Sequence, residues 1–192
     1  MFFEALILGM IIGYARRGRI SRLAYVHFNA QPLIYVSAVL YLGIIVMNLG
    51  LYDYSSFLYA GFLLISFILT LLFLIANISM KFMFVPLIGL FLNLLVFLVN
   101  GFKFPLDAAA AAKIYGTEIY ELLNNGKIIF FTSAENASLS FLGNIITVGN
   151  LFIVSIGDII AAMGIALVIQ AIISDKFIQS RNRITFSKNI FK

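Results

Sequence analysis

The chain has 192 residues, of which 62% are hydrophobic and only 11% are charged, and its mean hydropathy is +1.07. Soluble globular proteins have about 25% charged residues, so this composition excludes that class and predicts an integral membrane protein. The formal charge of +5 comes from basic clusters beside apolar runs, which favours membrane lipids with anionic headgroups as partners and argues against nucleic acid. The lack of cysteine and the single histidine, His27, argue against disulfides, thiol nucleophiles and zinc, and we expect no metal and no cofactor.

Apolar runs follow one another along the whole sequence. About 20 helical residues cross the hydrocarbon of a bilayer, and the first run is shorter than that. It still crosses if its flanking arginines reach the headgroups or the bilayer thins locally. We therefore predict an all-α integral membrane protein, a single domain built as a bundle of about five transmembrane helices. The predicted spans cover residues 2–15, 32–51, 57–78, 84–100 and 156–173.

The distribution of lysine and arginine predicts how the chain is threaded through the membrane. Positive charge follows the first apolar run, whereas a cleavable signal peptide has it in front, so we predict a retained helix with an outer N-terminus. Alternate threading puts ten basic residues inside and three outside, as the positive-inside rule requires. We expect a multi-pass protein of the cell (plasma) membrane with a cytoplasmic tail at 174–192. The inner residues are Arg16, Arg17, Arg19, Arg22, Lys81, Lys176, Arg181, Arg183, Lys188 and Lys192, and the outer ones are Lys103, Lys113 and Lys127.

Small residues recur at helical spacing in the first and last predicted spans. Gly9 and Gly13 form a GxxxG pattern, and Gly157, Ala161 and Gly164 recur on one face of the last span. Small side chains let helix backbones approach closely, which matters in lipid because no hydrophobic drive packs the helices. We predict that these residues are helix-packing positions.

The fourth predicted span carries a polar stripe formed by Pro86, Gly89, Asn93 and Asn100. An asparagine in lipid needs a hydrogen-bond partner, so this stripe is expected to face the bundle. Two interpretations stay open, because the asparagines either join helices through hydrogen bonds or line the path of a ligand or ion.

The segment 102–155 is expected to form an outer loop module. Asp107 is positioned to cap one amphipathic helix that continues to Asn124 and is closed by Gly126. The periodicity of this helix is typical of one that lies on the membrane or on the ends of the bundle. Its apolar face comprises Tyr115, Ile119, Leu122 and Leu123, and short apolar segments at 128–131 and 139–142 are expected to return toward the bundle.

Ser155 and Asp158 stand at the start of the last span, where an acid beside a long uncharged tract is costly unless it is satisfied. In one interpretation the two residues form a capping box for the helix. In the other, Asp158 faces a polar cavity and holds a cation, a proton or a ligand amine. Glu4 and Lys103 are expected at a similar depth, so the three charged groups are predicted to form one ion cluster, structural or ligand-binding.

Several short motifs occur in order along nearly the whole chain. With them the chain resembles an uncharacterised family of small bacterial multi-pass membrane proteins. The resemblance implies that the Asn-Gly…Pro element, the outer loop and the Ser-Ile-Gly-Asp element share a polar site on the outer face. An acid often follows Leu-Gly in that family, whereas position 144 is asparagine here, which would weaken a cation site. The motifs are Gly18-Arg-Ile-Ser-Arg-Leu23, Asn100-Gly-Phe-Lys-Phe-Pro105, Lys127-Ile-Ile-Phe-Phe-Thr132, Leu142-Gly-Asn144 and Ser155-Ile-Gly-Asp158.

These features predict a non-enzymatic membrane module that binds a small molecule, a lipid or a protein partner on its outer face, and a homo-oligomer stays open. A transporter, or the substrate-binding subunit of one, is the second hypothesis, although the odd number of spans and the lack of internal repeats argue against it. A lipid-active enzyme is third, because the chain has no P-loop and no HExxH motif, and we name no catalytic residue. The candidate ligand-binding residues are Glu4, Asn93, Asn100, Lys103 and Asp158.

Overall fold

The computed structural model describes residues 2–48, 55–125, 128, 130–149 and 151–175. Within these residues the protein is mostly helical. The helices are α1 (Phe2–Ala15), α2 (Gln31–Asn48), α3 (Ser56–Ala76), α4 (Phe84–Val99), α5 (Ala108–Tyr115), α6 (Glu118–Asn124) and α7 (Ile156–Ser174). The strands are β1 (Phe104–Leu106), β2 (Phe131–Ser133), β3 (Ile146–Val148) and β4 (Phe152–Val154), and the 3₁₀ turns are η1 (Ile20–Tyr25), η2 (Ala134–Asn136) and η3 (Ser140–Leu142).

Three helices in the described part of the chain, α2, α3 and α7, are long and apolar enough to cross a membrane. The apolar helices α1 and α4 have 14 and 16 residues, which makes them about 21 and 24 Å long. Helix α4 ends at Val99 because Gly101 and Phe102 adopt left-handed backbone angles, with φ of 62° and 66°. Three of the five predicted spans therefore coincide with helices that could cross a membrane, whereas crossing by α1 and α4 stays a prediction. The predicted residues 49–51 lie outside the described ones.

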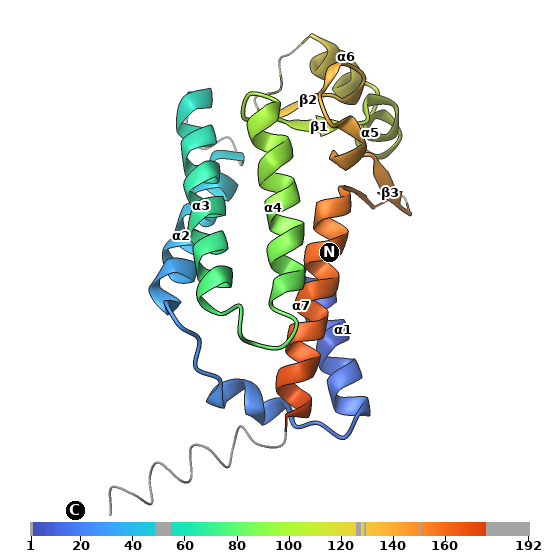
Figure 1. The fold of residues 1–192 in the computed structure, drawn as a ribbon. Helices are drawn as coiled ribbons and strands as arrows, with labels where there is room; N and C mark the ends of the chain where they lie inside the picture. Colours follow the sequence, from blue (N-terminus) through green and yellow to red (C-terminus); the bar gives the residue numbers. More distant parts are fainter. Residues whose placement is uncertain (1, 49–54, 126–127, 129, 150, 176–192) are drawn as a thin grey trace, which may run out of the picture.

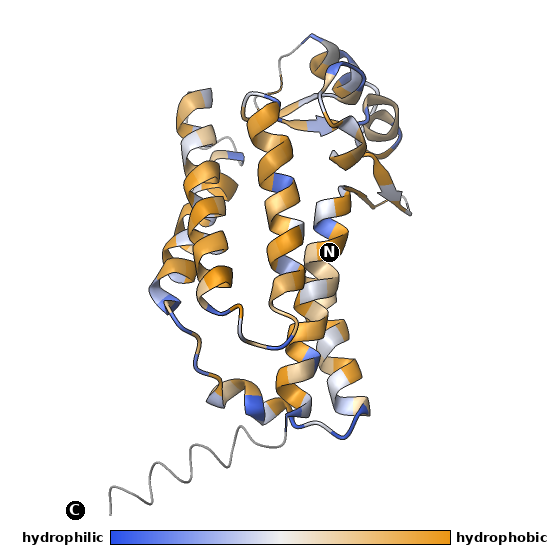
Figure 2. Cartoon of the chain, viewed as in Figure 1, coloured by the Kyte–Doolittle hydropathy of each residue, from blue (hydrophilic) through white to orange (hydrophobic). Residues whose placement is uncertain are grey.

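The long helices form a row in which each packs on the next, in the order α2, α3, α4, α7 and α1 (Figure 1). At one end of the helix axes lie the strands together with α5 and α6, and we call this the module end. The other end, where α7 finishes, is the tail end. Hydrophobic residues cover most of the helix surface, and hydrophilic residues gather at the two ends (Figure 2).

Small residues make the contacts of α7 with its two neighbours. A Cβ added at Gly9 in α1 would lie 2.6 Å from the carbonyl oxygen of Ala166. A Cβ at Gly89 in α4 would lie 2.5 Å from the carbonyl oxygen of Gly157. These approaches leave room only for hydrogen, so the helices can pack closely without any hydrophobic drive. The other small residues at these contacts are Gly13 against Ile173, Gly164 against Pro86, and Ala161 against Gly89.

Hydroxyl groups join α2 to α3. The Ser37 hydroxyl lies 3.0 Å from the Ser66 carbonyl oxygen, to which it donates, and 2.7 Å from the Thr70 hydroxyl. Ser66 donates in turn to the carbonyl oxygen of Phe62 at 2.8 Å. Such bonds hold helices together where the surrounding lipid offers no partner for a polar group.

Buried polar side chains tie the tail end together. Arg22 is only 7% exposed, and its Nη1 donates to the carbonyl oxygen of Ile173 at 2.6 Å, in the last turn of α7. A cation at this position also interacts favourably with the helix dipole. Asn77, which is 1% exposed, exchanges hydrogen bonds of 2.7 and 2.9 Å with the backbone of Asn29 and so joins the end of α3 to the start of α2. Arg22 therefore has a structural role beyond the basic cluster predicted from sequence.

The outer module differs from the prediction of one amphipathic helix. Gly116, with φ of 101°, separates α5 from α6, because this left-handed angle cannot continue a helix. Leu123 is buried, whereas Tyr115 and Leu122 are exposed, so the residues of the predicted apolar face are not buried together. The predicted closing residue, Gly126, lies outside the described residues. The N-cap of α5 is Asp107, whose side chain accepts hydrogen bonds from two backbone N–H groups.

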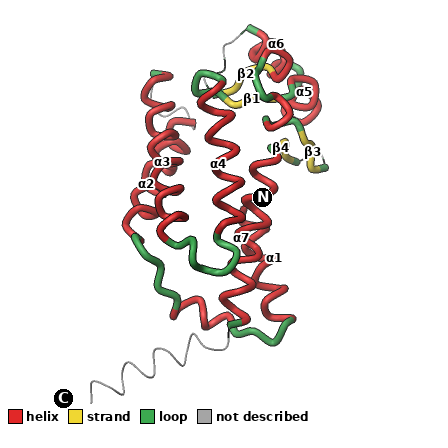
Figure 3. Tube along the Cα trace, in the orientation of Figure 1, coloured by secondary structure: helices red, strands yellow, loops and turns green. Residues whose placement is uncertain are grey.

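Short strands, absent from the all-α prediction, complete the module (Figure 3). β1 pairs with β2 in parallel, and β3 pairs with β4 antiparallel. On the other edge of β1, Asn144 donates its N–H to the Pro105 carbonyl oxygen at 2.8 Å and accepts from the Asp107 N–H at 3.1 Å. This pairing joins Asn144 to β1, and residues of both line the candidate site.

Candidate functional site

Asn93, Ser155 and Asp158 form one hydrogen-bonded cluster between α4 and α7 near the module end. The Asn93 Nδ2 donates to Asp158 Oδ1 at 2.7 Å, and the Ser155 hydroxyl donates to Asn93 Oδ1 at 2.8 Å. Asn93 and Ser155 are buried, at 8% and 3% exposure, whereas Asp158 is half-buried. The asparagine in the polar stripe thus finds its partner on the neighbouring helix.

The same residues start α7 through a capping box. Ser155 Oγ accepts the N–H of Asp158 at 2.9 Å, and Asp158 Oδ2 accepts the N–H of Ser155 at 3.1 Å. This arrangement satisfies two backbone donors and puts a negative charge at the positive end of the helix. The Ser155 hydroxyl gives its proton to an amide oxygen, which is a very weak base, so the geometry does not activate it as a nucleophile.

Gly157 makes this cluster possible. A Cβ at position 157 would overlap the side-chain amide of Asn93, so only glycine lets Asn93 reach across to α7. One turn away, Gly89 lies against the backbone of Ala161. The close α4–α7 contact and the polar cluster therefore depend on each other.

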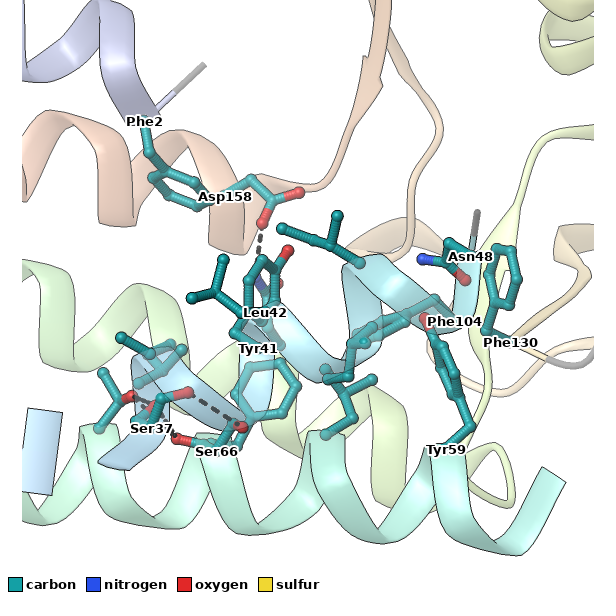
Figure 4. Close-up of a pocket in the computed structure, with 18 of the residues that line it drawn as sticks. Phe2, Ser37, Tyr41, Leu42, Asn48, Tyr59, Ser66, Phe104, Phe130 and Asp158 are labelled. Carbon is teal, nitrogen blue, oxygen red and sulfur yellow. Dashed lines mark hydrogen bonds between the residues drawn. The ribbon is translucent and has the colours of Figure 1, made fainter. Parts of the chain in front are cut away.

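A cavity of about 880 Å³ lies beside the cluster. Its volume falls within the range of roughly 300–1,000 Å³ that is usual for small-molecule sites. Helices α2 and α3 form one side, α4 and α7 form the other, and the module closes one end with Phe104, Phe130 and Val154 (Figure 4). Phe2 of α1 also lines it, so α1, α2, α3, α4 and α7 all contribute to the cavity wall.

The cavity wall is mainly apolar with a few polar groups. Aromatic side chains dominate the module side, where the rings of Tyr59 and Phe130 stack with centroids 5.3 Å apart. Asn93 and Asp158 form a polar edge, and Tyr41 approaches the same part of the cavity from α2 (Figure 4). An apolar body with one polar end would match this lining.

Among the described side chains that line the cavity, Asp158 is the one carboxylate. Its two oxygens accept hydrogen bonds from the neutral Asn93 amide and the neutral Ser155 N–H. Within the described ranges no lysine, arginine or histidine forms an ion pair with it. A cation in the cavity would therefore meet a carboxylate that no described basic side chain pairs.

The other predicted site residues lie apart from this cluster. Asn100 holds the loop at Ser138, because its Nδ2 donates to the Ser138 carbonyl oxygen and its Oδ1 accepts the Ser138 N–H, both at 2.9 Å. Lys103 is half-buried and does not line the cavity, and Glu4 is exposed on α1. Of the three residues predicted to form one ion cluster, only Asp158 lines the cavity, and the cluster itself stays a prediction.

Tyr41 and Asn144 also line the cavity, although sequence reasoning did not name them as ligand-binding residues. Tyr41 lies one helical turn after Ser37 on α2, so the spacing of polar residues in that span was the available signal. Asn144 reaches the cavity through its pairing with β1, which joins segments about 40 residues apart, and no local pattern indicates such a pairing.

The family model described as Family of unknown function (DUF5317) matches residues 25–170. Because this match covers well over half of the chain, the protein belongs to that family. No curated protein and no solved structure shows significant similarity to the chain. The match thus confirms the expectation that the chain belongs to a family of unknown function.

Proposed function

We propose that this member of the DUF5317 family is a multi-pass membrane protein that binds an amphiphilic small molecule or lipid in the cavity beside Asn93 and Asp158. The single observation that carries the proposal is the cavity itself, a volume of about 880 Å³ with a mainly apolar lining and a few polar groups, Asn93 and Asp158 among them. A site of this kind recognises an apolar body by burial and a polar group by hydrogen bonds.

In this proposal all five apolar helices cross the membrane of a bacterial cell, with the N-terminus and the module outside and the tail end in the cytoplasm. Charge at the two ends supports this orientation, because cytoplasmic ends of spans carry an excess of basic residues. Exposed basic residues at the tail end are Arg16, Arg17, Arg19 and Lys81, and exposed acids on the module are Glu118, Glu121 and Glu135. Anionic headgroups on the cytoplasmic side would be partners of these arginines.

The ligand is proposed to reach the cavity from within the lipid. Helix α1 packs on α7 and helix α2 packs on α3, which makes these two helices the ends of the row. Phe2 of α1 and Leu42 of α2 both line the cavity. An amphiphile moving sideways between α1 and α2 would therefore keep its apolar part out of water throughout.

The test compares two neighbouring tryptophan substitutions on α2. Ala38 lines the cavity and Val39 does not, and both side chains are exposed, so neither change overpacks the core. Ala38→Trp fills cavity volume, whereas Val39→Trp points toward lipid and serves as the matched control. Native mass spectrometry of protein extracted with its surrounding lipid measures which small molecules stay bound.

We expect the wild-type protein and the Val39→Trp variant to retain a bound amphiphile that the Ala38→Trp variant has lost. Equal retention in all three proteins, or no bound molecule in the wild type, would contradict the proposal. Circular dichroism shows whether both variants keep the helical content of the wild type.

A further inference from the structure

The carboxylate of Asp158 has unused hydrogen-bonding capacity in the cavity. A carboxylate offers about four lone-pair positions. Asn93 Nδ2 occupies one on Oδ1, at 2.7 Å, and the Ser155 N–H occupies one on Oδ2, at 3.1 Å. Both donors are neutral, and the described residues supply no ion pair, so apart from the dipole of α7 no charged partner is present and a ligand cation can still bind the carboxylate.

The apolar surroundings make the site selective for the charge of its ligand. In a largely apolar site a carboxylate is destabilised unless an opposite charge reaches it, and the same site repels another anion. A ligand with a carboxylate or phosphate at its polar end would place two like charges together. A ligand ammonium would form a charge-assisted hydrogen bond to Asp158, about twice as strong as a neutral one.

An inorganic cation fits the cavity less well than an organic one. Calcium takes six to eight oxygen ligands, as a rough guide, and magnesium needs about six. The described residues contain no group of three acidic, histidine or cysteine side chains that would hold a metal. The aromatic wall, where Tyr59 stacks on Phe130, suits the apolar body of an organic cation.

We propose that the cavity ligand is an amphiphile whose ammonium group binds Asp158 while its apolar body lies along α2 and α3, an inference that rests on the proposed function. Asn93 positions the carboxylate by holding Oδ1. Tyr41, on the opposite wall, lies where it can contact the same polar end (Figure 4). The amine belongs either to a lipid headgroup or to a free amphiphile.

The experiment uses photoreactive alkyl diazirines of one chain length that end in an amine, an alcohol or a carboxylate. The full-length protein is placed in nanodiscs of phosphatidylglycerol, a lipid without an ammonium group. Peptide mass spectrometry measures labelling of the cavity wall, divided by labelling of lipid-facing residues in the same sample. This ratio removes differences in how the probes partition into the bilayer.

Two variants are compared with the wild type. Asp158→Asn removes the charge, whereas the exchange Asn93→Asp with Asp158→Asn keeps one carboxylate and one amide in the hydrogen-bonded pair. In the wild type we expect the amine to label the cavity at least about tenfold more than the carboxylate does. Asp158→Asn should remove the preference for the amine over the alcohol, and the exchange variant should restore amine labelling.

Equal labelling by amine and alcohol in the wild type would overturn the assignment of a cation while leaving an amphiphile site in place. No labelling of the cavity by any probe would instead overturn the proposed function. If Asp158→Asn does not fold, the proposal is tested by the amine-to-carboxylate labelling ratio of the wild type and by the exchange variant. Amine labelling of the exchange variant below about a tenth of the wild-type level would count against the proposal.

A further arm identifies the source of the amine. Phosphatidylethanolamine is added to the nanodiscs at increasing fractions. Competition with the amine probe supports a lipid headgroup as the ligand, and labelling that phosphatidylethanolamine does not reduce supports a free amine amphiphile.

Discussion

Replacing Gly89 with alanine is expected to force α4 and α7 apart. The new Cβ would lie 2.5 Å from the carbonyl oxygen of Gly157 and 2.9 Å from the Cα of Ala161. Both are backbone atoms, so no side chain can rotate away. Moving the oxygen to an ordinary contact of 3.4 Å requires about 0.9 Å of separation between the helices.

Overpacking of this kind costs about 1–3 kcal/mol, and here we expect the upper half of that range because the obstruction is backbone. The shift also strains the Asn93–Asp158 bond, since Asn93 lies one turn from Gly89 on the same face. The matched control is Gly61→Ala in α3, where a Cβ would meet nothing within 4 Å. Its better helix propensity should raise stability by about 0.5–1 kcal/mol.

Reversible unfolding in mixed micelles, titrated with sodium dodecyl sulfate and followed by far-UV circular dichroism, measures both free energies of unfolding. A Gly89→Ala variant as stable as Gly61→Ala would show that α4 and α7 do not approach as closely as described. The position of the polar cluster would then have to be reconsidered.

Arg22→Ala should lower the free energy of unfolding by about 1.5–3 kcal/mol in the same assay, because a buried charged donor to α7 is lost, whereas exposed Arg19→Ala should stay within about 0.5 kcal/mol of the wild type. Asn100→Ala should free the loop at Ser138 and cost about 1–3 kcal/mol, and limited proteolysis that cuts this loop no faster than in the wild type would contradict the stated role. Ser37→Ala should cost about 0.5–2 kcal/mol by removing the α2–α3 hydroxyl bonds, and a more stable variant would argue against those bonds.

Local sequence patterns predict the long helices well. Apolar runs mark α2, α3 and α7 to within a few residues because burial in lipid acts on every residue of a span. Ser155 and Asp158 are recognisable as a capping box because its partners lie three residues apart. Gly116 followed by Thr117 was an available sign that α5 ends before α6 begins, and this sign was missed.

Local sequence patterns do not reveal contacts between segments that are distant in the sequence. The polar stripe of α4 indicated that Asn93 faces the bundle, but not that its partner is Asp158, 65 residues later. Arg22 looks like any other member of a basic cluster, although its guanidinium caps α7. Equal depth in the membrane suggested joining Glu4, Lys103 and Asp158, yet depth says nothing about the direction in which each side chain points around its helix.

The proposal depends on what occupies the space between the α2–α3 pair and α7. An experimental structure of the protein, solved in the lipid with which it was extracted, would show this without any probe. We expect elongated density in the cavity along α2 and α3, with one end within hydrogen-bonding distance of Asp158. A bundle in which α2 packs directly on α7 and leaves no such space would contradict the proposed function and the ligand chemistry drawn from it.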